Sequence, residues 1–216
     1  MKTLIINADD FGLSKIFNQD ILKCIEQWYI TSTTVMVLRL NIQHQRDDIE
    51  TLQHLSKTTW CSIWLHLEYQ NNTLTSKDME QQYELFVDIF GTQPSHIDVH
   101  KYSSYHNPFT DQLLIEFAQA KDMGIRNHGE YDKTYKKTTK HTVYNGTRKT
   151  IEEIYTYINS IENWKTWEIL LHPWSYDPTS TSSLNQERED DTIMAQHIYE
   201  YCTKESIRLV SFYAVR

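Results

Sequence analysis

The sequence predicts an α/β fold whose parallel strands close into an incomplete (β/α)7 barrel. Short apolar segments rich in β-branched residues alternate along the chain with longer segments whose apolar residues recur at helical spacing. Acidic residues or histidines stand at the ends of four of these strands. A barrel gathers the carboxyl ends of all its strands at one rim, whereas an open doubly wound sheet gathers only those beside a switch point, so the barrel is preferred.

The composition predicts one domain over residues 1–216. The formal net charge of −8 and the scattered basic residues argue against a nucleic-acid partner. The sequence has no apolar run suited to a signal segment or a bilayer span, so we expect a cytoplasmic protein with no membrane partner. Cys24, Cys61 and Cys202 are widely spaced and are expected to be buried thiols.

The first strand is expected at residues 4–8 and leads directly to Asp9 and Asp10. Adjacent side chains of a strand point to opposite faces, so the two acids can reach one site only if the backbone bends. Gly12 permits such a bend. Ser14 is a suitable N-cap for the helix that follows.

Three more strands are expected in the next part of the chain. Residues 33–38 are apolar and β-branched, which is typical of a strand buried on both faces. Residues 62–67 form a strand with His66 near its end, and residues 96–100 form a shorter strand that ends in His100. Apolar residues at helical spacing predict a helix between each pair of strands.

Glycines punctuate the middle of the chain. Gly91 and Gly124 are expected to stop the third and fourth helices. Residues 125–127 predict a fifth strand, and residues 142–144 a short one within a polar, turn-like segment.

The last third of the chain repeats the alternation. Residues 150–153 match a capping box at the start of a fifth helix. Residues 167–172 predict an apolar strand that ends in His172. A final helix over residues 186–204 leads to a terminal strand at residues 208–213.

The polar residues at these strand ends match the requirements of a hydrolytic metal site. Two imidazoles and a carboxylate, with open positions for water and substrate, commonly bind Zn²⁺ or another divalent ion. Because two touching acids cannot both stay ionised cheaply without a cation, one acid on the metal leaves its neighbour free to act as general base. His172 could protonate the leaving group, and Arg126 could orient the base carboxylate or lie on the surface.

The order of motifs resembles that of a known family. Residues 7–14 (NADDFGLS), 30–34 (ITSTT), 65–67 (LHL), 96–100 (HIDVH) and 172–173 (HP) are similar to the ordered motifs of the YdjC-like carbohydrate deacetylases, which include chitooligosaccharide deacetylases.

The resemblance implies a TIM-barrel-like fold and metal-dependent removal of an acetyl group from an N-acetylated sugar. It makes Asp10, His66 and His100 the ligands of one divalent cation, Mg²⁺ or Zn²⁺. It makes Asp9 the general base and His172 the acid, with a small N-acetylated carbohydrate as the substrate.

The chain also departs from the family pattern. His106 follows His100 with a spacing that differs from the family's, and it is a candidate to replace a substrate-contacting histidine. The glycine expected before His66 is replaced by the bulky pair Trp64-Leu65, and Trp174 stands where the family has the glycine of its His-Pro-Gly motif. Trp174 and Tyr176 are candidates for a wall that stacks on sugar, with loop packing as the alternative.

Two other functions fit the same residues. The metal site could hydrolyse a different amide or an ester. The altered loop after His100 also allows a non-catalytic sugar-binding relative. A homodimer is compatible with the sequence, which does not specify the oligomeric state.

Overall fold

The molecule is organised around one twisted sheet in which every strand pairing is parallel. The structure is a computed structural model that describes residues 1–105, 107–126, 144–164, 166–180, 182, 188 and 190–215. Its strands are β1 (Thr3–Phe11), β2 (Ser32–Val35), β3 (Ser62–Leu67), β4 (His96–Val99), β5 (Gly124–Ile125), β6 (Tyr144–Asn145), β7 (Thr166–Leu171) and β8 (Arg208–Leu209).

The strand order is β5-β4-β3-β2-β1-β7-β6, and β8 pairs with the start of β1. The seven strands of this path curl into an open half-barrel, so the predicted incomplete TIM barrel is confirmed. Because β1 lies between β2 and β7 in this order, its carboxyl end is flanked by those of β2 and β7.

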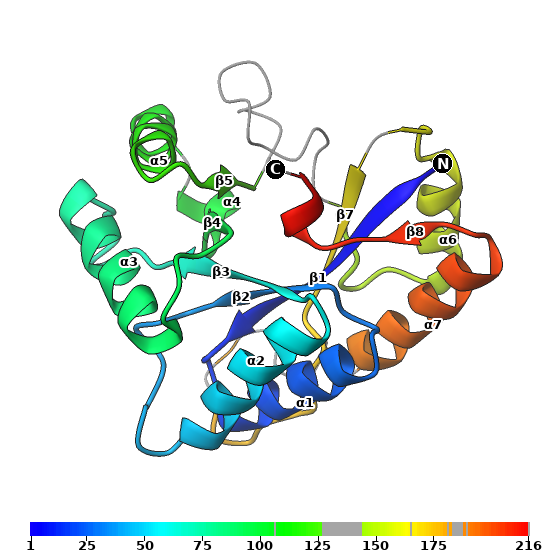
Figure 1. Cartoon of the computed structure of the whole chain (residues 1–216), viewed down its shortest axis with the longest axis horizontal. Coiled ribbons are helices and arrows are strands. Elements are labelled where there is room, and N and C mark those ends of the chain that lie inside the picture. Colours follow the sequence, from blue (N-terminus) through cyan, green and yellow to red (C-terminus); the bar gives the residue numbers. More distant parts are fainter. Residues whose placement is uncertain are drawn as a thin grey trace.

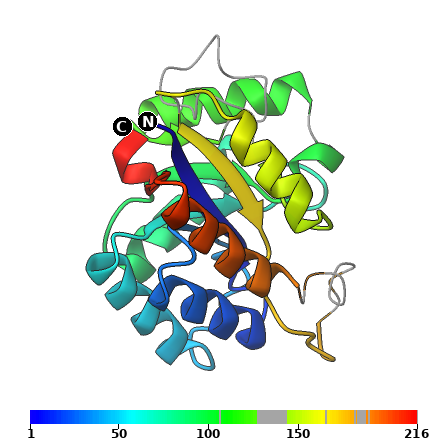
Figure 2. The same ribbon diagram turned by 90° about the vertical axis from the view of Figure 1, so that its right-hand side faces the viewer.

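Helices cover the convex side of the sheet (Figure 1). They follow the arc from α5 and α3 at one end, past α2 and α1, to α7 and α6 at the other, and Figure 2 shows α6 and α7 beside β1 and β7. Their bounds are α1 (Lys15–Glu26), α2 (Arg46–Thr58), α3 (Ser76–Phe90), α4 (Tyr102–Tyr105), α5 (Pro108–Ala120), α6 (Ile151–Ser160) and α7 (Asp191–Lys204).

Alternation along β1 separates two apolar cores. Leu4, Ile6 and Ala8 belong to the large cluster that includes the buried faces of the helices. Ile5 belongs instead to a small cluster with Trp64, Val210 and Phe212. This period of two explains why Asn7 and Asp9, which alternate with Ile6 and Ala8, share the face of Ile5.

Several local signals of the sequence act as predicted. Ser14 caps α1 by accepting a hydrogen bond from the Phe17 amide, and Gly91 ends α3 with a left-handed φ of 69°. Thr150 and Glu153 form the expected capping box of α6. All three cysteines are buried free thiols, and burial raises the pKa of Cys24 and Cys202 to about 12.

The ends of the chain's elements differ from their predicted bounds. β1 runs on to Phe11, and β2 ends at Val35 rather than at residue 38. The predicted terminal strand is reduced to β8. The Val210 amide still donates to the Leu4 carbonyl at 2.9 Å, but the chain then turns so that Phe212 packs against Trp64 inside the half-barrel. A short helix, η1 (Phe212–Val215), takes the place of the remaining strand.

Two other predicted elements can be compared only in part. The last helix begins at Asp191, and residues 186, 187 and 189 of its predicted start lie outside the described residues. The same holds for residue 127 of the fifth strand and for residues 142 and 143, next to β6. Within the described ranges, every helix lacks the combination of length and hydropathy needed to cross a membrane.

Candidate functional site

The end of β1 turns two adjacent acids toward a common region. The register between β1 and β2 shifts between Ala8 and Phe11, and Asp10 itself has a left-handed φ of 72°. The Asp10 amide donates to the Thr34 hydroxyl at 3.0 Å, which holds this bend. The bend was expected at Gly12, whose φ is 105°, but it begins two residues earlier at Asp10.

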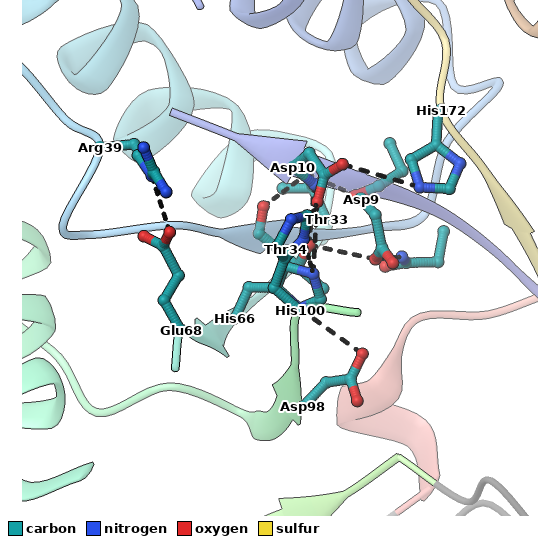
Figure 3. Close-up of polar contacts among 12 residues, drawn as sticks. Asp9, Asp10, Thr33, Thr34, Arg39, His66, Glu68, Asp98, His100 and His172 are labelled. Carbon is teal, nitrogen blue, oxygen red and sulfur yellow. Dashed lines mark hydrogen bonds and ion pairs between the residues drawn. The ribbon is translucent and has the colours of Figure 1, made fainter. Parts of the chain in front are cut away.

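Asp10 meets two histidines, His66 of β3 and His100 directly after β4 (Figure 3). Asp10 Oδ1 lies 3.1 Å from His100 Nδ1 and 3.3 Å from His66 Nε2, and these two nitrogens are 3.3 Å apart. A tetrahedral ion about 2.0–2.1 Å from its ligands would separate their atoms by about 3.3–3.4 Å. The three side chains therefore fit one divalent cation, and His100 is the partly exposed member that leaves the group open to solvent.

The charge of this region also favours a cation. Burial alone would lower the pKa of His66, but the carboxylates of Asp9, Asp10 and Asp98 raise it to about 9. His66 Nδ1 lies 3.5 Å from Asp98 Oδ2, so a carboxylate stands behind the imidazole on the side away from Asp10. Such a carboxylate orients many metal-binding histidines and strengthens their basicity.

A second group of possible ligands overlaps the first. Asp9, His66 and Asp98 also bring ligand atoms close enough to hold an ion. However, Arg126 Nη1 donates to both Asp9 Oδ2 and Asp98 Oδ2, so a guanidinium already supplies positive charge there. We therefore favour the group of Asp10, His66 and His100, whose carboxylate is free of Arg126 in the described contacts.

Asp9 is held by a dense set of donors. Arg126 donates to both of its oxygens at 2.9 Å, and Oδ1 also accepts from Asn7 Nδ2 at 2.7 Å and from the Thr34 hydroxyl at 3.1 Å. Burial opposes ionisation, but the Arg126 guanidinium holds the pKa of Asp9 below its ordinary value. Oδ2 accepts only the Arg126 bond among the described residues, so it is the oxygen that can accept another proton or hydrogen bond.

His172 reaches the same region from the end of β7. Its Nε2 lies 3.7 Å from Asp10 Oδ2, while Nδ1 lies 2.9 Å from the Thr147 hydroxyl. Because Thr147 gives its one hydrogen to Asp191 Oδ2, Nδ1 carries the imidazole proton and Nε2 faces Asp10 bare. Burial and the nearby Arg188 cation lower the pKa of His172 to about 3, so the ring is neutral.

The three predicted substrate contacts differ in their exposure and in whether the structure describes them. Trp174 is completely buried and stacks on Phe17 with ring centroids 4.0 Å apart, so it packs the loop and presents no face to a sugar. The prediction that Trp174 stacks on sugar is therefore wrong, and its alternative role in loop packing holds. Tyr176 is half exposed and remains a candidate. His106 lies outside the described residues.

The structure adds residues that sequence reasoning did not single out. Glu168 accepts from Arg126 Nε and Nη2, and it could have been noticed as a charged residue inside an apolar strand. Asp98 could have been found by alternation from His100. Arg188, whose Nη1 lies 3.4 Å from Asp10 Oδ2, comes from a polar loop in which nothing distinguishes it beforehand.

The family model described as YdjC-like protein matches residues 3–69, which contain Asp9, Asp10 and His66. A chitooligosaccharide deacetylase of Proteus mirabilis is 30% identical over 57% of this chain and 58% of its own length. Carbohydrate deacetylase 2 of Listeria innocua is 25% identical over 98% of both chains. Over residues 3–69 the chain is therefore similar to YdjC-like proteins. It spans little more than half the length of the Proteus relative.

Solved structures share the fold of this chain. A protein of Enterococcus faecalis V583 matches with a TM-score of 0.78 and 18% identity, covering 99% of this chain and 98% of its own. A family 4 acetyl xylan esterase of Clostridium thermocellum, in complex with a cobalt ion, matches with a TM-score of 0.57 and 12% identity over 99% and 90%. A CE4 family pseudoenzyme of Bacillus anthracis has a TM-score of 0.60 and 7% identity over 99% and 65%. At these identities the likeness extends to the fold alone.

Proposed function

We propose that this protein is a metal-dependent deacetylase that hydrolyses the acetyl amide of an N-acetylated sugar or short oligosaccharide. The observation that carries the proposal is the meeting of Asp10 Oδ1, His66 Nε2 and His100 Nδ1 within 3.3 Å of one another. The names of the Proteus and Listeria relatives supply the reaction and the class of substrate.

Asp10, His66 and His100 would hold the divalent cation. Such an ion lowers the pKa of a water molecule and polarises a carbonyl oxygen. The two imidazoles favour zinc or a similar transition metal over magnesium. Metal analysis of the purified protein would identify the ion.

Asp9 is the proposed general base. Its Oδ2 retains accepting capacity, and Arg126 stabilises its ionised form, so it is ready to take a proton from the attacking water. Arg126 acts by orienting this carboxylate through two hydrogen bonds of 2.9 Å.

His172 is the proposed acid toward the leaving nitrogen. Because its ring is neutral, it would accept at Nε2 the proton that the attacking water gives up to Asp9, and it would pass this proton to the sugar nitrogen as the C–N bond breaks. The Thr147 hydroxyl and Asp191 keep the ring oriented and offset its charge while it is protonated.

Acetate release tests the function. Purified protein loaded with Zn²⁺, Co²⁺ or Mg²⁺ is incubated with N,N′-diacetylchitobiose and longer chito-oligosaccharides, and with an O-acetylated xylo-oligosaccharide as the ester. We expect acetate from the amide substrates, abolished by Asp9→Ala and by His66→Ala in variants whose circular dichroism matches the parent. Unchanged turnover in either variant would remove the assigned site.

The same assay separates the alternatives. Acetate from the ester alone identifies an esterase, a reaction for which the xylan esterase shows the fold to be suitable. Binding of chito-oligosaccharide by calorimetry without acetate release, under every metal tested, identifies a non-catalytic relative such as the pseudoenzyme that shares the fold.

A further inference from the structure

The guanidinium of Arg126 has every donor in use. Nε donates to Glu168 Oε1 at 3.0 Å and Nη2 to the same oxygen at 2.7 Å. The remaining hydrogens of Nη1 and Nη2 go to Asp9, and to Asp98 from Nη1. All five N–H groups are therefore satisfied in a side chain that is 1% exposed.

Trp64 completes the enclosure of Arg126. The Arg126 Cζ atom lies 4.2 Å from the centroid of the indole, so the ring covers one face of the guanidinium. The same indole donates from Nε1 to Asn7 Oδ1 at 2.9 Å. Asn7 in turn donates from Nδ2 to Asp9 Oδ1 at 2.7 Å.

These contacts form a closed ring of four side chains: Trp64, Asn7, Asp9 and Arg126. Trp64 touches both groups that orient Asp9, one by its ring face and one by its N–H. Its bonded partner Asn7 is fully buried, so its amide cannot exchange a lost hydrogen bond for one with bulk water. Moving Trp64 therefore loosens both supports of Asp9 at once.

We propose that Trp64 and Glu168 are positioning residues that fix Arg126, and through Asn7 and Arg126 fix the orientation of the Asp9 carboxylate. This inference rests on the proposed function only for the role of Asp9 as base.

The first test uses a pair of matched variants around the indole. Trp64→Phe keeps an aromatic ring but removes Nε1–H. Phe212→Leu instead disturbs another neighbour of the indole, with ring centroids 4.5 Å apart, without removing the hydrogen bond. Misplacement of a reacting group by an ångström can cost about 100-fold in rate. We expect Trp64→Phe to lower kcat by about 10- to 100-fold with KM and metal affinity within about 2-fold, and Phe212→Leu to leave kcat within about 3-fold.

The second test separates charge from geometry at Glu168. Glu168→Gln keeps an oxygen that can accept from Nε and Nη2, whereas Glu168→Leu removes it. Rescue of kcat in Glu168→Gln relative to Glu168→Leu supports positioning. The proposal is overturned if both variants lose equal activity, or if Phe212→Leu lowers kcat as much as Trp64→Phe.

A third readout does not depend on acetate release. In ¹⁵N-resolved NMR spectra of the metal-free protein, the Arg126 Nε–H exchanges slowly with solvent if the guanidinium is fixed. We expect the exchange to accelerate at least about 10-fold in Trp64→Phe and Glu168→Leu, but not in Phe212→Leu. Equal exchange in all variants overturns the positioning of Arg126, whereas altered exchange in a protein that releases no acetate leaves the positioning intact and removes the proposed function instead.

Discussion

Arg126 donates to both oxygens of Asp9, from Nη1 to Oδ2 and from Nη2 to Oδ1, at 2.9 Å in each case. The next residue, Asp10, instead directs Oδ1 toward two imidazoles. The left-handed backbone at Asp10 is what gives two adjacent carboxylates such different neighbours. One acid is neutralised by the Arg126 guanidinium, and the other faces the two histidines with which we propose that it binds a metal.

Removing Arg126 should strongly destabilise the protein. Arg126→Met leaves the buried carboxylates of Asp9, Asp98 and Glu168 without their counter-ion, which costs about 3–5 kcal/mol in the free energy of unfolding. Urea denaturation at pH 7 measures this loss. Lys23→Met is the control, because Lys23 is 70% exposed and its pair with Asp20 contributes at most about 1 kcal/mol. Similar losses of stability in both variants would contradict the role of Arg126 as the counter-ion of these buried carboxylates.

Metal affinity should depend on His100. Outer partners of metal ligands already contribute about 10- to 100-fold to affinity, so loss of a ligand in His100→Ala should weaken binding of Zn²⁺ by more than about 100-fold. Titration calorimetry measures the dissociation constant. His197→Ala removes an exposed histidine from α7, away from the cluster, and should leave the dissociation constant unchanged. Equal binding by the two variants would exclude His100 as a ligand.

Gly12 should tolerate a side chain less well than Gly91 does. Both have positive φ, so alanine costs about 1 kcal/mol at either position from backbone strain. A Cβ on Gly12 would also lie 2.9 Å from the Met36 carbonyl oxygen, whereas one on Gly91 meets nothing within 4 Å. Thermal unfolding should therefore show Gly12→Ala to be less stable than Gly91→Ala, by about another 1–2 kcal/mol. The reverse order would mean that the loop after β1 relaxes without cost.

Glu168 should make stability depend on pH. Burial, partly offset by Arg126, raises the pKa of Glu168 from 4.5 to about 7 in the folded protein. Between these values the native state holds a proton that the unfolded state has released, so this group lowers the free energy of unfolding as the pH rises. Glu168→Gln cannot titrate, and its stability relative to the parent should increase from pH 4.5 to pH 8. Denaturation curves at both pH values test this, and parallel pH profiles would contradict it.

The sequence was sufficient for the architecture because its signals are local and repeated. Alternation of apolar strands with amphipathic helices predicts a parallel α/β barrel, and the caps at Ser14, Gly91 and Thr150 are formed by residues a few positions away. The terminal strand was wrong beyond Leu209, because the burial of Phe212 against Trp64 depends on a partner distant in sequence. A local pattern cannot contain that information.

The same division applies to the site. The sequence by itself determined which chemistry-bearing residues stand at strand ends, since strand periodicity and residue type are readable one segment at a time. Only the tertiary structure decided that Asp10, rather than Gly12, makes the bend, that Trp174 is buried, and that Arg126 pairs with Asp9. Curvature of the sheet and burial bring these groups together from distant segments, and their charges then set one another's protonation.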